Sequence, residues 1–93
     1  MRVELAKSNR KGKKYMAKVQ GKTVHFGATG YQDFTQHQDS KRKERYIKRH
    51  RANENWNDTS SAGFWARHLL WSEPSLAQAI RKTEQKFKLD IVK

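Results

Sequence analysis

The segment with the clearest chemistry is residues 41 to 51, which read KRKERYIKRHR and fall within a predicted helix. Only one acid, Glu44, lies among its cations, so ion pairs between successive turns cannot offset the repulsion between the cations. A bound anion would offset it. Nucleic acid is the commonest polyanion that such a helix meets. We therefore predict that this helix contacts nucleic acid through Lys41, Arg42, Lys43, Arg45, Lys48, Arg49 and Arg51.

A second group of cations lies nearer the N-terminus, and we expect it to add contacts from a flexible arm and from a hairpin. Contacts to phosphate position a protein without reading base sequence. We therefore predict backbone binding with little sequence preference, with DNA favoured over RNA. The residues of this second group are Lys11, Lys13, Lys14, Lys18 and Lys22.

The composition sets limits on the kind of protein this can be. The 93 residues suffice for one small domain, and 21 Lys+Arg against 9 Asp+Glu leave a formal net charge of +12. The absence of Cys excludes a disulfide framework and Cys-based zinc sites. No apolar run reaches membrane-spanning length and no signal-peptide pattern opens the chain, so we expect no membrane partner and an intracellular or particle-packaged protein.

Two runs of alternating residues predict a β-hairpin. Tyr15, Ala17 and Val19 alternate with residues of which only Met16 is apolar, Val24 and Phe26 alternate with polar residues, and a Gln-Gly pair lies between the runs. The preceding residues 1–13 are predicted to be a basic flexible arm, so the single domain is expected over residues 14–93. Residues 31–39 show no period and are predicted to be a loop.

Three helices are expected after the hairpin. Asp39 or Ser40 can cap the basic helix, which is predicted to run to about Glu54. A second helix over residues 61–71 is apolar on most sides and is expected at the centre of the core. Residues 75–78 form a plausible capping box for a third helix, and residues 89–91 could add a short strand beside the hairpin. These elements predict an α+β fold with an N-terminal β-hairpin packed on a cluster of about three helices.

The order of four motifs in the chain is distinctive. They are GKTVHFG at residues 21–27, GYQDFT at residues 30–35, the basic helix, and AGFWARHLLW at residues 62–71. In this order they resemble a small family of uncharacterised basic proteins encoded by large DNA viruses of algae and protists and by some phages. The resemblance covers residues 14 to 88 and brings no established activity with it. It implies a viral setting, in which genome binding or packaging is more plausible than a metabolic role.

The histidines give only weak metal patterns. His37 lies between Asp33 and Asp39, and His37, Asn57 and His68 are the residue types of a His-Asn-His nuclease without its spacing. The four histidines, His25, His37, His50 and His68, include no close-spaced ligand pair, so no metal or cofactor is predicted.

A nuclease of another kind is an alternative, because a hairpin followed by a basic helix is similar to the GIY-YIG endonuclease layout. Tyr15 would match the first motif, residues 25–27 the second, Arg42 or Arg45 the helix arginine, and Glu84 the metal ligand. This chain departs from the pattern with Lys14 at the first glycine and with His25 at the second tyrosine, which puts that chemistry in doubt.

A structural role is the other alternative, in which a virion or assembly protein contacts the genome or an acidic partner. The aromatic residues in predicted loops are a separate candidate for nucleic-acid contact, because exposed rings can stack on bases. We expect packing rather than stacking for these residues, which are Tyr31, Phe34 and Trp56.

Overall fold

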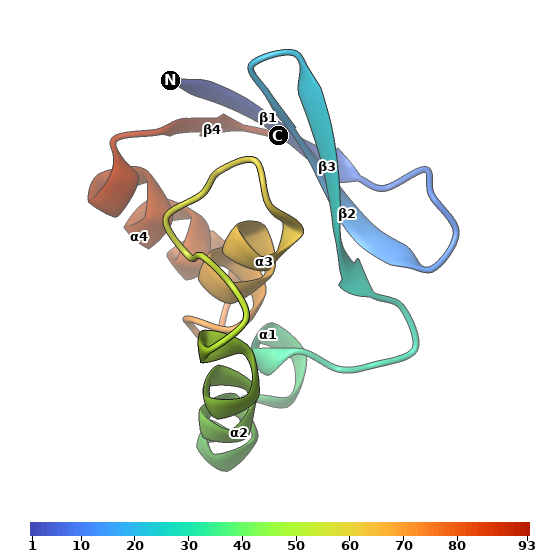
Figure 1. The fold of residues 1–93 in the computed structure, drawn as a ribbon, viewed down its shortest axis with the longest axis vertical. Helices are drawn as coiled ribbons and strands as arrows, with labels where there is room; N and C mark the ends of the chain where they lie inside the picture. The colour runs from blue at the N-terminus through green and yellow to red at the C-terminus, as the bar shows by residue number, and fades with distance from the viewer.

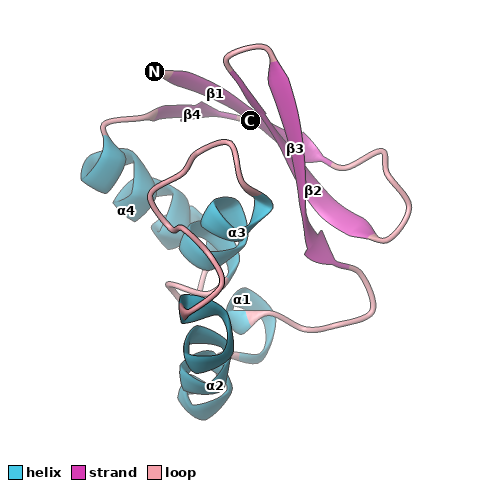
Figure 2. Ribbon diagram, in the orientation of Figure 1, coloured by secondary structure: helices cyan, strands magenta, loops and turns pink.

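A computed structural model describes residues 1–93 as four strands and a set of short helices, which confirms the predicted α+β class (Figures 1 and 2). No helix combines the length and the apolar character needed to span a bilayer. In chain order the elements are β1 Arg2–Lys7, β2 Lys13–Val19, β3 Lys22–Ala28, α1 Phe34–His37, α2 Ser40–Arg51, α3 Ala62–Trp65, the π-helical turn η1 Ala66–Leu70, α4 Leu76–Phe87 and β4 Asp90–Val92.

The predicted hairpin is present as β2 and β3, which pair antiparallel with Tyr15 opposite Phe26. Its two turn residues, Gln20 and Gly21, both have positive φ values, at 48° and 80°. Two successive positive φ values are the signature of the primed turn whose twist matches the strands it joins. The Gln-Gly pair between the two runs therefore marked the turn correctly.

The N-terminal residues form a strand, so the prediction of a flexible arm over residues 1–13 is wrong for β1. The sheet has the order β3-β2-β1-β4, and Val3 pairs with Val19 on one side and with Ile91 on the other. Val3 is fully buried and Leu5 is 5% exposed. The domain therefore begins with the first residues, and only the turn between β1 and β2 carries the basic, polar sequence expected of an arm.

The C-terminal strand β4 lies parallel to β1 at the edge of the sheet. The amide of Asp90 donates to the Met1 carbonyl at 2.9 Å, which holds the two ends of the chain together. The predicted short strand is thus present, but β1 separates it from the hairpin (Figure 1).

The core lies between one face of the sheet and the helices α3, η1 and α4. Residues 61–71 were predicted to form one helix, but Ser61 caps a four-residue α3 that widens into the π-helical η1. The largest side chains with almost no exposure come from this region and from the sheet. They are Trp65, Phe26, Phe64, Leu69, Leu70 and Val3.

The basic helix α2 extends away from the sheet and contacts the rest of the protein along one edge (Figure 1). Asp39 caps it as predicted, accepting from the amides of Lys41 and Arg42, and it ends at Arg51 rather than near Glu54. The preceding segment was predicted to be a loop throughout. It contains the short α1, because the Asp33 and Gln36 side chains form a capping box with the local backbone.

Candidate nucleic-acid interface

Helix α2 is attached to the core through the ring of Tyr46, its only buried residue. This ring lies between two others, stacked on Trp71 with 4.3 Å between centroids and on His50 with 4.2 Å. Burial raises the pKa of the Tyr46 phenol, so the group stays neutral at physiological pH. The thin apolar stripe of the helix is therefore enough to fix its position, and its remaining surface is left to cations.

Lys43 differs from the other cations of α2 because it serves the fold. Its Nζ donates to the Ser72 carbonyl at 2.7 Å and lies 5.0 Å from the centroid of the Phe34 ring. Burial, followed by the nearby Arg67 charge, lowers the pKa of Lys43. This side chain is thus committed to an internal contact.

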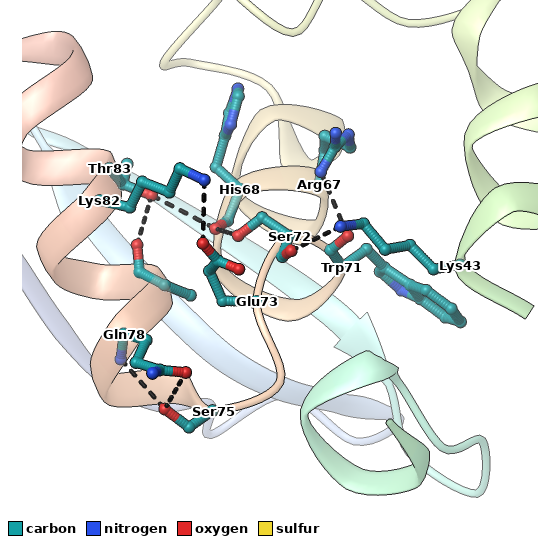
Figure 3. A network of polar contacts seen from close by, with 11 residues as sticks. Lys43, Arg67, His68, Trp71, Ser72, Glu73, Ser75, Gln78, Lys82 and Thr83 are labelled. Atoms are coloured by element: carbon teal, nitrogen blue, oxygen red, sulfur yellow. Dashed lines mark hydrogen bonds and ion pairs between the residues drawn. The ribbon is translucent and has the colours of Figure 1, made fainter. Parts of the chain in front are cut away.

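The turn that receives Lys43 is braced by a polar network that joins η1 to α4 (Figure 3). Ser72 Oγ donates to the His68 carbonyl at 2.6 Å, whereas the Thr83 hydroxyl donates to the Ala79 carbonyl at 2.7 Å and lies 3.3 Å from the His68 carbonyl. Lys82 pairs with Glu73 at 2.9 Å. The segment that carries Trp71 is therefore tied to η1 through Ser72 and to α4 through Glu73.

Three arginines of α2 line one hollow, which has a volume of about 510 Å³. Arg42, Arg45 and Arg49 are spaced by three and four residues, which places them on one face of the helix. None of their side chains makes an ion pair or a hydrogen bond within the chain. We call these three residues the arginine triad.

The other walls of the hollow come from the sheet and from the central helices. Lys13 and Lys14 of β2 add two further cations, and Tyr31 is 76% exposed in the loop after β3. The opposite wall is mainly small and apolar, and it includes Gly27, Ala28, Ala62, Gly63, Ala66, Leu70 and Trp71.

The two acids in these walls already have partners. Asp33 accepts from Lys14 Nζ at 2.7 Å, and Glu54 bonds with His50 Nδ1 and accepts from Trp56 Nε1, both at 2.8 Å. Neither acid forms an ion pair with the arginine triad or with Lys13, and the cations that line the hollow outnumber its acids. Arginine forks bind phosphate and carboxylate in bidentate fashion, so the hollow is suited to an anionic ligand.

The remaining predicted cations lie elsewhere. Lys41, Lys48 and Arg51 are exposed on α2 away from the hollow, and we call them the outer trio. Lys18 and Lys22 line a separate groove beside the β2–β3 turn, at the opposite end of the molecule from α2 (Figure 1). Lys11 is exposed in the turn between β1 and β2. The cations predicted to bind nucleic acid are thus divided among several surfaces of the molecule.

The residues of the GIY-YIG alternative do not meet in one cavity. Tyr15 stacks on Phe26 with 6.0 Å between centroids, and Glu84 accepts from the Ile91 amide at 2.9 Å. Neither of them lines the hollow that contains Arg42 and Arg45.

The histidines of the two metal patterns likewise make unrelated contacts. His37 packs against Trp71, whereas His68 Nε2 donates to the Trp56 carbonyl at 2.9 Å. No three His, Asp or Glu side chains are grouped to hold a metal ion.

Residues 3–50 match a family described as a family of unknown function, DUF5754. The chain belongs to this family. The DUF5754 match covers β1, β2, β3 and α1 and nearly all of α2, and so includes the arginine triad. No curated protein and no solved structure matches the chain.

Sequence reasoning treated the loop aromatics as one group, but the structure separates them. Phe34 is 7% exposed, and Trp56 lies beneath the Arg67 guanidinium at 5.2 Å, so both pack as predicted. Tyr31 is instead one of two exposed large hydrophobic residues in the chain. The signal that could have found the site is the segregation of arginine on α2, because the triad repeats at helical spacing whereas the outer trio is mostly lysine.

Proposed function

We propose that this protein binds nucleic acid through α2, mainly by contacts to the sugar–phosphate backbone and with little sequence preference. The observation that carries the proposal is a set of α2 cations without a partner in the chain. They are Lys41, Arg42, Arg45, Lys48, Arg49 and Arg51. So many unpaired cations on one short helix repel each other, and a bound polyanion relieves that repulsion.

DNA is the favoured ligand within this proposal, because the motif order resembles that of proteins from large DNA viruses. The biological role that follows is binding or packaging of viral DNA. A structural role in virion assembly is the alternative, with α2 seated against the packaged genome or an acidic protein.

The test is a fluorescence-anisotropy titration of double-stranded DNA, single-stranded DNA and RNA over a salt series. Neutralising about five phosphates makes log K fall with log salt at a slope of about −4 or steeper. Replacing the six unpaired α2 cations with Gln should abolish this binding while the circular dichroism spectrum stays unchanged.

A control variant loses the same charge from exposed positions outside α2, and it should keep most of the affinity. Its six Gln replacements are at Arg2, Lys7, Arg10, Arg81, Lys86 and Lys93. Equal losses in the two variants would mean that net charge, rather than α2, determines binding. Weak binding with little salt dependence would overturn the proposal and favour an acidic protein partner.

A further inference from the structure

We propose that the hollow lined by the arginine triad is a pocket for one unstacked nucleotide, so that the preferred ligand is a single strand. This inference rests on the proposed function and specifies the form of nucleic acid. The first argument is shape. The hollow holds about 510 Å³ and, unlike two grooves of similar volume, is bounded on one side by the arginines of α2 and on the other by β3, α3 and η1.

The arginine triad points to a ligand that enters this concave space. Arg42, Arg45 and Arg49 line the gap between α2 and the walls formed by β3, α3 and η1. A duplex is a convex rod with its bases stacked inside, so only its phosphates could reach the rim. A single strand can direct a whole nucleotide inward, because its bases are free to leave the stack.

The chemistry of the walls matches the parts of a nucleotide. The triad and Lys13 supply donors for a phosphate, and both acids in the walls are occupied by other partners. Ala62, Ala66 and Leu70 give the opposite wall small and apolar side chains, against which a flat ring can pack. The hollow therefore offers a cationic side and an apolar side.

Tyr31 supplies the second independent observation. Its side chain is 76% exposed although it is a large aromatic, and it lines the same hollow. An exposed aromatic beside unpaired arginines is the combination by which proteins bind single strands, with the ring stacked on a base and the cations on the backbone. No core contact explains the position of this ring.

The deciding experiment compares one labelled oligonucleotide as a single strand and as a duplex, by anisotropy at one salt concentration. Two triple Gln variants remove equal charge from different faces of α2: R42Q/R45Q/R49Q removes the arginine triad and K41Q/K48Q/R51Q removes the outer trio. We expect the single strand to bind at least about tenfold more tightly than the duplex. Loss of the triad should weaken single-strand binding at least about tenfold more than loss of the outer trio.

Tyr31→Ala provides a test that does not disturb the core. It should weaken single-strand binding about tenfold, as expected from loss of one base stack, and leave the salt slope unchanged. Tyr31→Phe should bind as the unaltered protein does.

The inference is overturned if the duplex binds as tightly as the single strand, or if the two triple variants lose affinity equally. In either case salt-dependent binding would persist and the proposed function would stand. Absence of salt-dependent binding to every ligand would instead overturn the proposed function, and the pocket assignment with it.

Discussion

The rings of Tyr46 and Trp71 lie parallel, with 3° between their planes and 4.3 Å between their centroids. This stack joins the basic helix to the segment that follows η1, which the Ser72 bond to the His68 carbonyl and the Lys82–Glu73 pair hold from the other side. Because Tyr46 is the only buried residue of α2, the stack also determines where the arginine triad sits. The position of the candidate site thus depends on this aromatic pair, together with the Lys43 contact to Ser72.

Truncation of this contact should release the helix. We expect Tyr46→Ala to lower the free energy of unfolding by about 3 kcal/mol, because a buried aromatic ring is lost and leaves a cavity. The measurement is urea denaturation followed by tryptophan fluorescence. Tyr46→Phe keeps the ring and should cost less than about 1 kcal/mol, since no hydrogen bond within the chain uses the Tyr46 hydroxyl. A loss of similar size in both variants would contradict the stacking argument.

Local sequence patterns predicted the β2–β3 hairpin and the N-terminal cap of α2. The alternation around Gln20-Gly21 located the hairpin, and Asp39 was recognised as a cap, because both depend on neighbouring residues. β1 was missed although its antiparallel partner β2 is the next element, because only Val3 and Leu5 mark its buried face and a basic, polar turn follows it. Its parallel partner β4 lies at the far end of the chain, and such distant pairing leaves no local pattern.

The candidate site, like the fold, could be predicted from the sequence only in part. The arginine spacing on α2 is visible in the sequence, since positions three and four apart share a helix face. The hollow itself could not be predicted, because β2, β3, α3 and η1 meet α2 only in the folded chain. The tertiary partners of Lys14 and Lys43 were hidden for the same reason, so both were predicted to contact nucleic acid.

The contact between Lys14 and Asp33 gives a second prediction. Their side chains are 15% and 5% exposed and 2.7 Å apart, so removal of one partner leaves the other charge buried. We expect Asp33→Asn to lower the free energy of unfolding by about 3 kcal/mol. Glu73→Gln is the matched control, because it breaks the more exposed pair with Lys82 and should cost about 1 kcal/mol or less. Equal costs in urea denaturation would show that the Lys14 pair is as solvated as the surface pair.

The dependence of stability on pH follows from two histidines. Burial lowers the pKa of His68 and of His37, so the folded protein favours neutral imidazoles. The unfolded chain takes up these protons near pH 6.5, so their contribution to stability is present above that pH. It is lost as the pH falls from 6.5 toward the lowered values of the folded state. The slope stays below the limit of about 1.4 kcal/mol per pH unit for one fully buried histidine, because solvent screens both imidazoles and His37 more than His68.

The check is a series of urea denaturations between neutral and mildly acidic pH. His68→Gln replaces the imidazole with an amide that can still donate to the Trp56 carbonyl, so the slope of stability against pH should become shallower. Further replacement of His37 with Gln should flatten it more. An unchanged slope in the double variant would assign the acid sensitivity to other groups.

Gly27 offers a prediction about the wall of the hollow. Its φ is +80°, and an added Cβ would lie 2.8 Å from Leu70 Cδ1 and 3.2 Å from Lys14 Cβ. Gly30 has a similar φ of +86°, but a Cβ added there would have no heavy atom within 4 Å. A substitution at Gly30 therefore measures the cost of the backbone conformation alone. We expect Gly30→Ala to cost about 1 kcal/mol, and Gly27→Ala to cost clearly more because Leu70 is fixed in the core. If urea denaturation gave equal losses of stability for the two variants, Leu70 would have room to move, and the packing in this wall would be looser than the structure indicates.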